Sequence, residues 1–391
     1  MIQFFYTKRA PLRSLVITLI ICFGKFASTN AQQTLSASLV HDGITRSYIL
    51  YVPELYTDDT PAPLVFNFHG YTSNANDQMN YGDFRPLADT NGFIIVHPMG
   101  TVDNNGNTHF NVGWGTSTVD DVGFTEALID EISSNYTIDA SRIYSTGMSN
   151  GGFMSYKLAC ELSNRFAAIA SVTGTMNKNQ TNSCNPTHQM PVMEIHGTSD
   201  PTVPYEGANW IESTPSVLSF WANFNNCHPD PEITDIEDSN TSDGSTVEYQ
   251  LYTNGDNGAT VAHYKIINGG HKWPGTSYNS PGTNYDIDAS ALIWNFFSKY
   301  DINGLISTLS VTDFEENNTV TKIYPNPVHA TLTVTLKNTA PVSYTISSLD
   351  GKLLSQGSVS IQDNKINCST LTADAVYVLT IGNTTVKIKK T

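Results

Sequence analysis

The chain has 391 residues, of which 39% are hydrophobic, and carries a formal net charge of −16. This length is compatible with one large domain and one small one, and the apolar content is sufficient for a sizeable core. The excess of acidic groups disfavours nucleic acids and anionic membranes as partners, because their phosphates would repel the protein.

Residues 1–31 have the pattern of a secretory signal peptide. Three basic residues precede the apolar run Leu15–Phe23, and the small residues Thr29 and Ala31 suit cleavage after position 31. An uncleaved membrane anchor is the weaker alternative, because a span needs about 20 apolar residues. We therefore predict a secreted protein, found outside the cell or at its surface, in which disulfides are permitted.

Residues 32–300 alternate between short apolar runs and stretches with helical spacing, the pattern of an α/β domain. Buried strands that alternate with helices predict a mainly parallel sheet covered on both faces. The ranges predicted as strands are 35–53 (a hairpin), 62–70, 92–100, 141–147, 167–174, 190–197 and 261–269, and those predicted as helices are 120–136, 148–166, 215–227 and 288–300.

The character of the sequence changes after Tyr300. Residues 301–322 are polar, without helical periodicity, and are predicted to be a linker. Residues 323–391 show apolar residues at every second position, which predicts a small all-β, sandwich-like module. The module is poor in aromatic side chains, which argues against a platform for sugar rings.

A Gly-rich corner lies at Gly147-Met148-Ser149-Asn150-Gly151, between a predicted strand and a predicted helix. This is the pattern of a nucleophile elbow, a sharp turn that exposes a serine hydroxyl. Small neighbours allow the chain to turn, and the amides that open the helix favour a developing oxyanion. A Gly-rich loop with a helix-capping serine is the structural alternative. The flanking strand and helix favour Ser149 as a catalytic nucleophile.

A nucleophilic serine needs a base and an acid that orients the base, and in this type of site they follow in the order Ser, Asp, His. His271 comes directly after a late strand, on a loop with two glycines, and is the predicted base. Asp200 lies five residues beyond Ile195, the expected end of the preceding strand, and is the predicted acid. The alternatives are a turn histidine and a turn aspartate before proline.

An oxyanion hole requires two amides, for which we predict those of Asn150 and Tyr71. Gly70 lacks a side chain, so that the backbone can approach a substrate, and His69 and Gly70 are predicted to lie against it. Four such features in this order predict an α/β-hydrolase that works through an acyl-enzyme. No Cys or His cluster has the spacing of a zinc site, and no cofactor is expected.

Between Ser36 and Tyr300 the chain resembles the secreted esterase family of polyhydroxybutyrate depolymerases and feruloyl esterases. The resemblance rests on the segments FHGYTSN, DDVGF, RIYSTGMSNGGFMSYKLACELSNRFAAIA, HGTSDPTVPYEG and GGHKWPG. It implies the same triad of Ser149, Asp200 and His271. It also implies that Trp273 lines the acyl pocket, with a plain core tryptophan as the alternative.

The tail, from the YPNP segment at Tyr324 to the basic end, resembles the C-terminal sorting domain of type IX secretion. This implies the type IX machinery as a partner, whereas an immunoglobulin-like accessory module is the alternative. Among the exported cysteines, Cys160 and Cys184 are close in sequence and are the expected disulfide. Cys227 and Cys368 fall in different domains and are expected to be unpaired.

The leading hypothesis is therefore a secreted serine ester hydrolase. Its substrate would be a polymeric or oligomeric ester, either ferulate linked to xylan or a polyhydroxyalkanoate. Two alternatives use the same catalytic parts: an acetyl xylan esterase and a serine peptidase. A third is an inactive hydrolase fold that serves as a surface carbohydrate-binding protein.

Overall fold

The computed structural model describes residues 32–178, 180–278, 280–306, 320–336, 341–348, 352–373, 375–382 and 384–391. The chain divides between Ile306 and Ser307 into two compact units. The expected signal peptide and most of the expected linker lie outside the described residues. In the part of the chain that is described, no helix is both long enough and apolar enough to cross a membrane.

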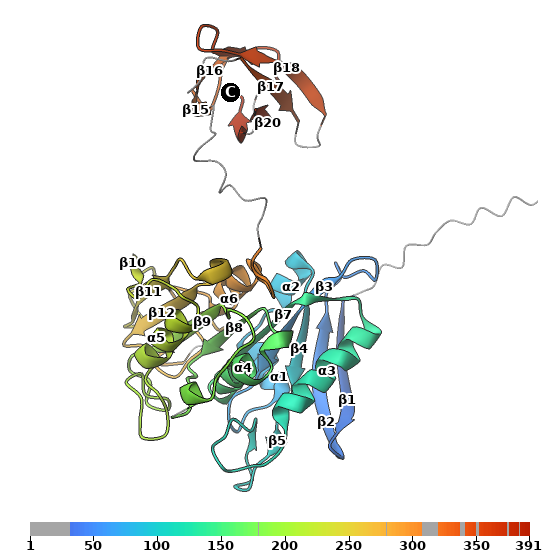
Figure 1. Cartoon of the computed structure of the whole chain (residues 1–391), viewed down its shortest axis with the longest axis vertical. Coiled ribbons are helices and arrows are strands. Elements are labelled where there is room, and N and C mark those ends of the chain that lie inside the picture. The colour runs from blue at the N-terminus through green and yellow to red at the C-terminus, as the bar shows by residue number, and fades with distance from the viewer. Residues whose placement is uncertain are drawn as a thin grey trace, which may run out of the picture. The chain divides into compact units, whose positions relative to one another are not determined.

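The first unit is built on one sheet of ten strands (Figure 1). The six central strands run parallel, and antiparallel strands flank them on both sides. In spatial order the strands are β1 (Gln33–His41), β2 (Ile44–Val52), β4 (Ile94–Pro98), β3 (Ala62–Phe68), β7 (Ile138–Met148), β8 (Ala168–Val172), β9 (Val192–Gly197), β12 (Val261–Ile267), β11 (Thr246–Tyr252) and β10 (Glu232–Ile236).

Helices cover both faces of this sheet, which confirms the predicted layers. The helices α3 (Asp121–Asn135), α4 (Asn150–Glu161) and α5 (Thr214–Phe224) contribute to the core on one face. The helices α2 (Arg85–Asn91) and α6 (Ala289–Phe297) contribute to the core on the other face. Parallel strands place their carboxyl ends at one edge, so the loops that follow β3, β7, β9 and β12 are brought together there.

Several elements of the first unit were not predicted. The strands β10 and β11 extend the sheet, and the helices α1 (Ala75–Tyr81) and α2 are only seven residues long. Helices of this length show too few turns for a periodic pattern, which explains why the sequence did not indicate them. The shortest strands are β5 (Thr101–Val102), β6 (Thr108–His109), β13 (Tyr300–Asp301) and β14 (Gly304–Leu305).

The second unit consists of two antiparallel sheets around a common apolar core, which confirms the predicted small β-sandwich. Leu332, Val334, Leu379 and Ile388 are fully buried in it. One sheet contains β15 (Val320–Tyr324), β16 (Thr331–Leu336) and β19 (Lys365–Asn367). The other contains β18 (Leu353–Val359), β17 (Val342–Ser347), β20 (Val376–Ile381) and β21 (Thr384–Lys389).

Candidate active site

Ser149 occupies the turn between β7 and α4, with backbone angles φ 54° and ψ −119°. A positive φ is uncommon outside glycine and marks a strained residue that its surroundings hold in place. The Ser149 amide donates to the carbonyl oxygen of Val172 at 2.8 Å, which fixes the turn against β8. A Cβ atom on Gly151 would overlap the carbonyl oxygen of Phe68, so that position requires glycine. The elbow predicted from the sequence is therefore present as backbone geometry.

Asp200 and His271 lie on the loops that follow the neighbouring strands β9 and β12. These loops are joined by main-chain hydrogen bonds, among them one from the Ser199 amide to the Gly269 carbonyl oxygen at 3.0 Å. A Cβ atom on Gly197 would overlap that same carbonyl oxygen, so only glycine allows this close approach. As a result, His271 Nδ1 lies 2.7 Å from Asp200 Oδ2.

The Asp200 carboxylate is held on both of its oxygens. Oδ1 accepts hydrogen bonds from the amides of Thr202 and Val203, at 2.8 and 2.9 Å. Burial opposes ionisation, but hydrogen bonds from His196 and His271 outweigh it and lower the pKa of Asp200 well below its usual range. Asp200 therefore stays ionised at neutral pH and can accept the Nδ1 proton of His271, which leaves Nε2 of that ring free to act as a base.

Ser149 and His271 both line one cleft of about 590 Å³. Asp200, which is 6% exposed, does not line this cleft. The structure thus brings the three predicted catalytic residues together in the predicted order. The other lining residues are Gly70, Tyr71, Ser73, Asp77, Gln78, Tyr81, Met148, Lys272, Tyr278 and Ser280.

Of the two predicted oxyanion-hole residues, Asn150 directly follows Ser149, and Tyr71 lies on the loop after β3. Asn150 is the first residue of α4, and the first amides of a helix have no acceptor within the helix. Tyr71 lines the cleft, and within the described residues its amide has no hydrogen-bonded acceptor. The Tyr71 ring is fixed by its hydroxyl, which donates to Asp103 at 2.8 Å. The Tyr71 amide is thus available to a ligand in the cleft, whereas Asn150 is fully buried and is not among the residues that line the cleft, so its amide as the second donor stays a prediction.

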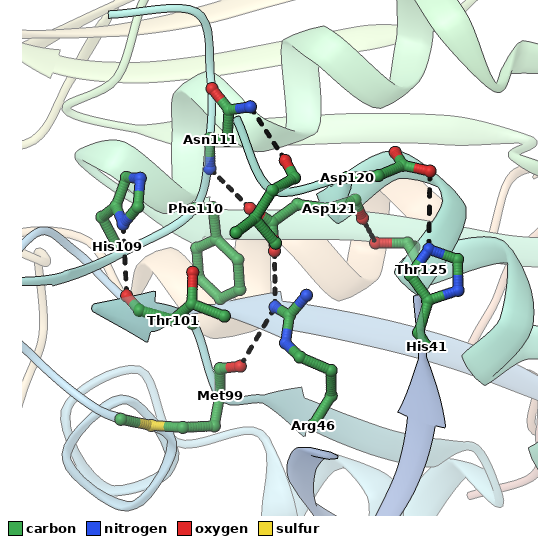
Figure 2. A network of polar contacts seen from close by, with 12 residues as sticks. His41, Arg46, Met99, Thr101, His109, Phe110, Asn111, Asp120, Asp121 and Thr125 are labelled. Carbon is green, nitrogen blue, oxygen red and sulfur yellow. Dashed lines mark hydrogen bonds and ion pairs between the residues drawn. The ribbon is translucent and has the colours of Figure 1, made fainter. Parts of the chain in front are cut away.

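A polar network connects the segment that contacts Asn150 to β2 and α3, and Figure 2 shows the part of it around Asp121. The Asn150 side chain exchanges two hydrogen bonds with the backbone of Phe110, at 2.7 and 3.0 Å. The next residue, Asn111, donates its amide to Asp121 at 2.6 Å. Asp121 also pairs with Arg46 of β2, whose guanidinium lies 3.9 Å from the Phe124 ring centroid. The loop that holds Asn150 is therefore anchored to both β2 and α3.

Breaking the Arg46–Asp121 pair is expected to destabilise the first unit strongly. Both side chains are almost fully buried, so Asp121→Asn leaves an uncompensated guanidinium in the core. The free energy of unfolding should fall by about 3–5 kcal/mol. Urea denaturation followed by tryptophan fluorescence measures this, because all five tryptophans lie in the first unit. The control Asp83→Asn breaks a partly exposed pair with Arg85 and should cost under about 1 kcal/mol. Equal losses in the two variants would contradict the argument.

Two residues predicted to contact substrate do not reach the cleft. His69 is fully buried: Nε2 accepts from the Gly100 amide at 3.0 Å, and Nδ1 lies 2.7 Å from the Gly70 carbonyl oxygen. Burial lowers the pKa of His69 to about 4, so the ring is neutral. Trp273 is 1% exposed, donates from Nε1 to Ser290 and packs in the core. Both predictions were wrong, because neighbourhood in sequence does not fix the direction of a side chain.

The residues that sequence reasoning missed are Glu194 and His196, on β9. They form a buried chain of polar contacts that ends at Asp200. The available signal was their spacing, since residues i and i+2 of a strand face the same side and both are ionisable in a buried run. Elsewhere, the structure contains the disulfide Cys160–Cys184, while Cys227 and Cys368 are free.

The parallel sheet and the order Ser149, Asp200, His271 along it define the class of the α/β-hydrolases. Comparison with known proteins agrees. Residues 118–226 match the family model described as phospholipase/carboxylesterase. Residues 322–391 match the model described as secretion system C-terminal sorting domain. The sorting domain assigns the protein to type IX export, and hence to the cell surface or the medium.

The chain belongs to the feruloyl esterase family of carboxylesterases. It is 31% identical over 196 residues to a probable feruloyl esterase C of Aspergillus flavus, a match that covers 49% of this chain and 68% of that protein. It is 27% identical to the bifunctional acetylxylan esterase/xylanase XynS20E of Neocallimastix patriciarum, covering 68% of this chain but only 35% of that relative. Among solved structures, the acetyl xylan esterase from Aspergillus awamori aligns with a TM-score of 0.49 and 13% identity, over 69% of this chain and 99% of that one.

Proposed function

We propose that this protein is a secreted serine esterase that removes acyl groups, most favourably feruloyl groups, from polysaccharides outside the cell. The observation that carries the proposal is the 2.7 Å contact between His271 Nδ1 and Asp200, with Ser149 and His271 lining the same cleft. Membership of the family makes the ester bond the expected target. Hydrolysis of an ester in this way needs no cofactor.

In the proposed reaction Ser149 Oγ attacks the ester carbonyl carbon while His271 Nε2 accepts its proton. Asp200 keeps the Nδ1 proton in place and stabilises the imidazolium that forms. The amides of Tyr71 and Asn150 donate to the oxyanion of the tetrahedral intermediate. His271 then gives its proton to the departing alcohol, and a water molecule, deprotonated in the same way, releases the acid from Ser149.

The residues around the cleft support an aromatic acyl group. Tyr71, Tyr81 and Tyr278 line it, and the rings of Tyr81 and Tyr278 lie 5.8 Å apart. Rings at this distance are already in contact with each other, and a phenolic ring in the cleft would pack offset or edge-on against the pair.

A row of aromatic rings extends from the cleft. This row supports the proposal that the ester of the substrate is attached to a polymer. The Tyr71 ring lies 5.9 Å from that of Trp114, which lies 5.8 Å from that of Trp210. Asn177 accepts from Trp114 Nε1 at 3.0 Å and fixes this ring. Trp210 is 46% exposed, unusual for a large apolar side chain beside an active site. Exposed indole rings suit the apolar faces of neutral sugars.

A substrate panel tests the proposed function. Purified protein is assayed with methyl ferulate, feruloylated xylan oligosaccharides, acetylated xylan, hydroxybutyrate oligomers and a peptide amide. We expect the highest kcat/KM on the feruloylated oligosaccharide. Turnover of the peptide alone would favour a peptidase. If the protein bound xylan without releasing any acid, a carbohydrate-binding role would replace the proposal.

The variant Trp210→Ala distinguishes binding of the sugar chain from recognition of the ester group. Its KM for the feruloylated oligosaccharide should rise about fivefold, the loss expected for one aromatic contact worth about 1 kcal/mol. Its kinetics on methyl ferulate should not change, because that ester carries no sugar. The matched control is Ile233→Ala, another exposed apolar side chain, on β10. An equal change on both substrates in the Trp210 variant would contradict the row of rings as a sugar-binding surface.

A further inference from the structure

The acid of the proposed triad is contacted by two imidazole rings. His271 lies on the cleft side of Asp200, and His196 Nε2 lies 3.4 Å from the same Oδ2 atom on the buried side. His196 is fully buried at the end of β9. It takes no part in the reaction described above, so a buried, ionisable group beside the catalytic acid calls for a physical explanation.

Both nitrogens of His196 face oxygen atoms that accept hydrogen bonds. Nδ1 lies 2.9 Å from a carboxylate oxygen of Glu194, and Nε2 lies 2.9 Å from the carbonyl oxygen of Val203. A neutral imidazole has only one N–H, so one of these contacts would place a lone pair against an oxygen. Two carboxylates lie within 3.4 Å of the ring, and no positively charged group among the described residues contacts it, so the surroundings favour a second proton on His196.

The surroundings of this ring complete the arrangement. Glu194 is 1% exposed, and its second oxygen accepts from the Tyr156 hydroxyl of α4 at 2.8 Å. The Tyr205 ring lies edge-on to His196, and the Thr214 hydroxyl is 3.4 Å from Nδ1. Burial alone would lower the pKa of His196, but Asp200 and Glu194 raise it to about 10.

A second buried histidine provides a comparison. His263 of β12 has one nitrogen 3.0 Å from the Glu194 carbonyl oxygen and the other 3.0 Å from the Tyr205 hydroxyl. A hydroxyl can donate, so a neutral ring satisfies both contacts. Burial lowers the pKa of His263 to about 3, with nearby His196 among the smaller causes. Two buried rings in one region therefore have opposite hydrogen-bond requirements.

We propose that His196 is a permanently protonated positioning residue, which bridges Glu194 and Asp200, fixes the catalytic carboxylate from behind and tunes the basicity of His271. The proposal rests on the proposed function, because it takes Asp200 as the acid of the triad. The positive charge of His196 competes with His271 for the same oxygen. It thereby weakens the attraction between Asp200 and an imidazolium at His271.

The protonation state can be measured without any assay of activity. In the full chain labelled with ¹⁵N-histidine, we expect both side-chain nitrogens of His196 to show the shifts of an imidazolium at pH 8. The signals are assigned by their loss in His196→Gln. A neutral ring at pH 8, with the proton on Glu194 instead, would overturn the proposal even if the enzyme is fully active.

The pH dependence of kcat/KM tests the effect on catalysis. In His196→Gln the acid limb should move to higher pH by about 0.5–1 unit, because a like charge near His271 has been removed. His263→Gln, which replaces a buried neutral histidine nearby, should leave the limb in place. If kcat fell but the acid limb of the pH profile did not move, His196 would have only a structural role and the proposal would be overturned. If Ser149→Ala retained activity, the proposed function would fail, yet the nitrogen shifts would still decide the charge of His196.

Discussion

Replacing Ser149 by alanine is expected to lower kcat on methyl ferulate by about four to six orders of magnitude. The substitution removes the nucleophile and changes little else. The Ser149 amide and carbonyl, which bond to Val172 and Phe153, belong to the backbone and remain in place. The residual rate would come from the amides of Tyr71 and Asn150 and from binding, which do not depend on the hydroxyl.

Stopped assays with long incubation are needed to quantify such a loss. The melting temperature and the affinity for ferulate should stay close to those of the unaltered protein, which separates lost chemistry from lost folding. Ser199→Ala serves as the control, since Ser199 is an exposed serine on the loop after β9. An activity within tenfold of the original enzyme would refute an acyl-enzyme on Ser149. Labelling by a fluorophosphonate, present in the original chain and absent in the variant, provides a second measure.

The predictable parts of the site are those in which the residue types restrict the path of the backbone. A serine between glycines at the junction of a strand and a helix has few structural solutions, and the loops after successive parallel strands meet at one edge. The order of Ser149, Asp200 and His271 followed from these two constraints. Their predicted positions depend on topology, which the alternation of strands and helices already indicated.

The failed predictions concern the directions of side chains. His69 and Trp273 each lie within two residues of a functional group, yet both turn into the protein. Trp273 packs on Phe84 beneath α6, with ring centroids 6.0 Å apart, so its place is set by residues distant in sequence. Hydrophobic periodicity and sequence motifs do not contain that information, because the whole fold determines which side chains pack against one another.

Glu194 and His196 were missed for a related reason. Their shared face on β9 is visible in the sequence, but burial of that face is not. Once buried, an acidic and a basic group two residues apart must interact, and the ion pair then reaches Asp200.

Asp200→Asn is expected to lower kcat by about 10⁴-fold while KM changes little. An amide cannot reproduce the contacts of this carboxylate. Oδ1 accepts from two backbone amides, and Oδ2 faces His271 and His196. If the asparagine NH₂ group faces the histidines, His271 must carry its proton on Nε2 and can no longer accept one from Ser149. If it faces the amides of Thr202 and Val203, N–H groups oppose N–H groups and the loop is forced apart.

Steady-state kinetics on methyl ferulate measure the loss, and Glu206→Gln, which removes an exposed charge from the same loop, should stay within twofold. A comparable loss in Glu206→Gln would show that the net charge of the loop, rather than the tautomer of His271, governs the rate.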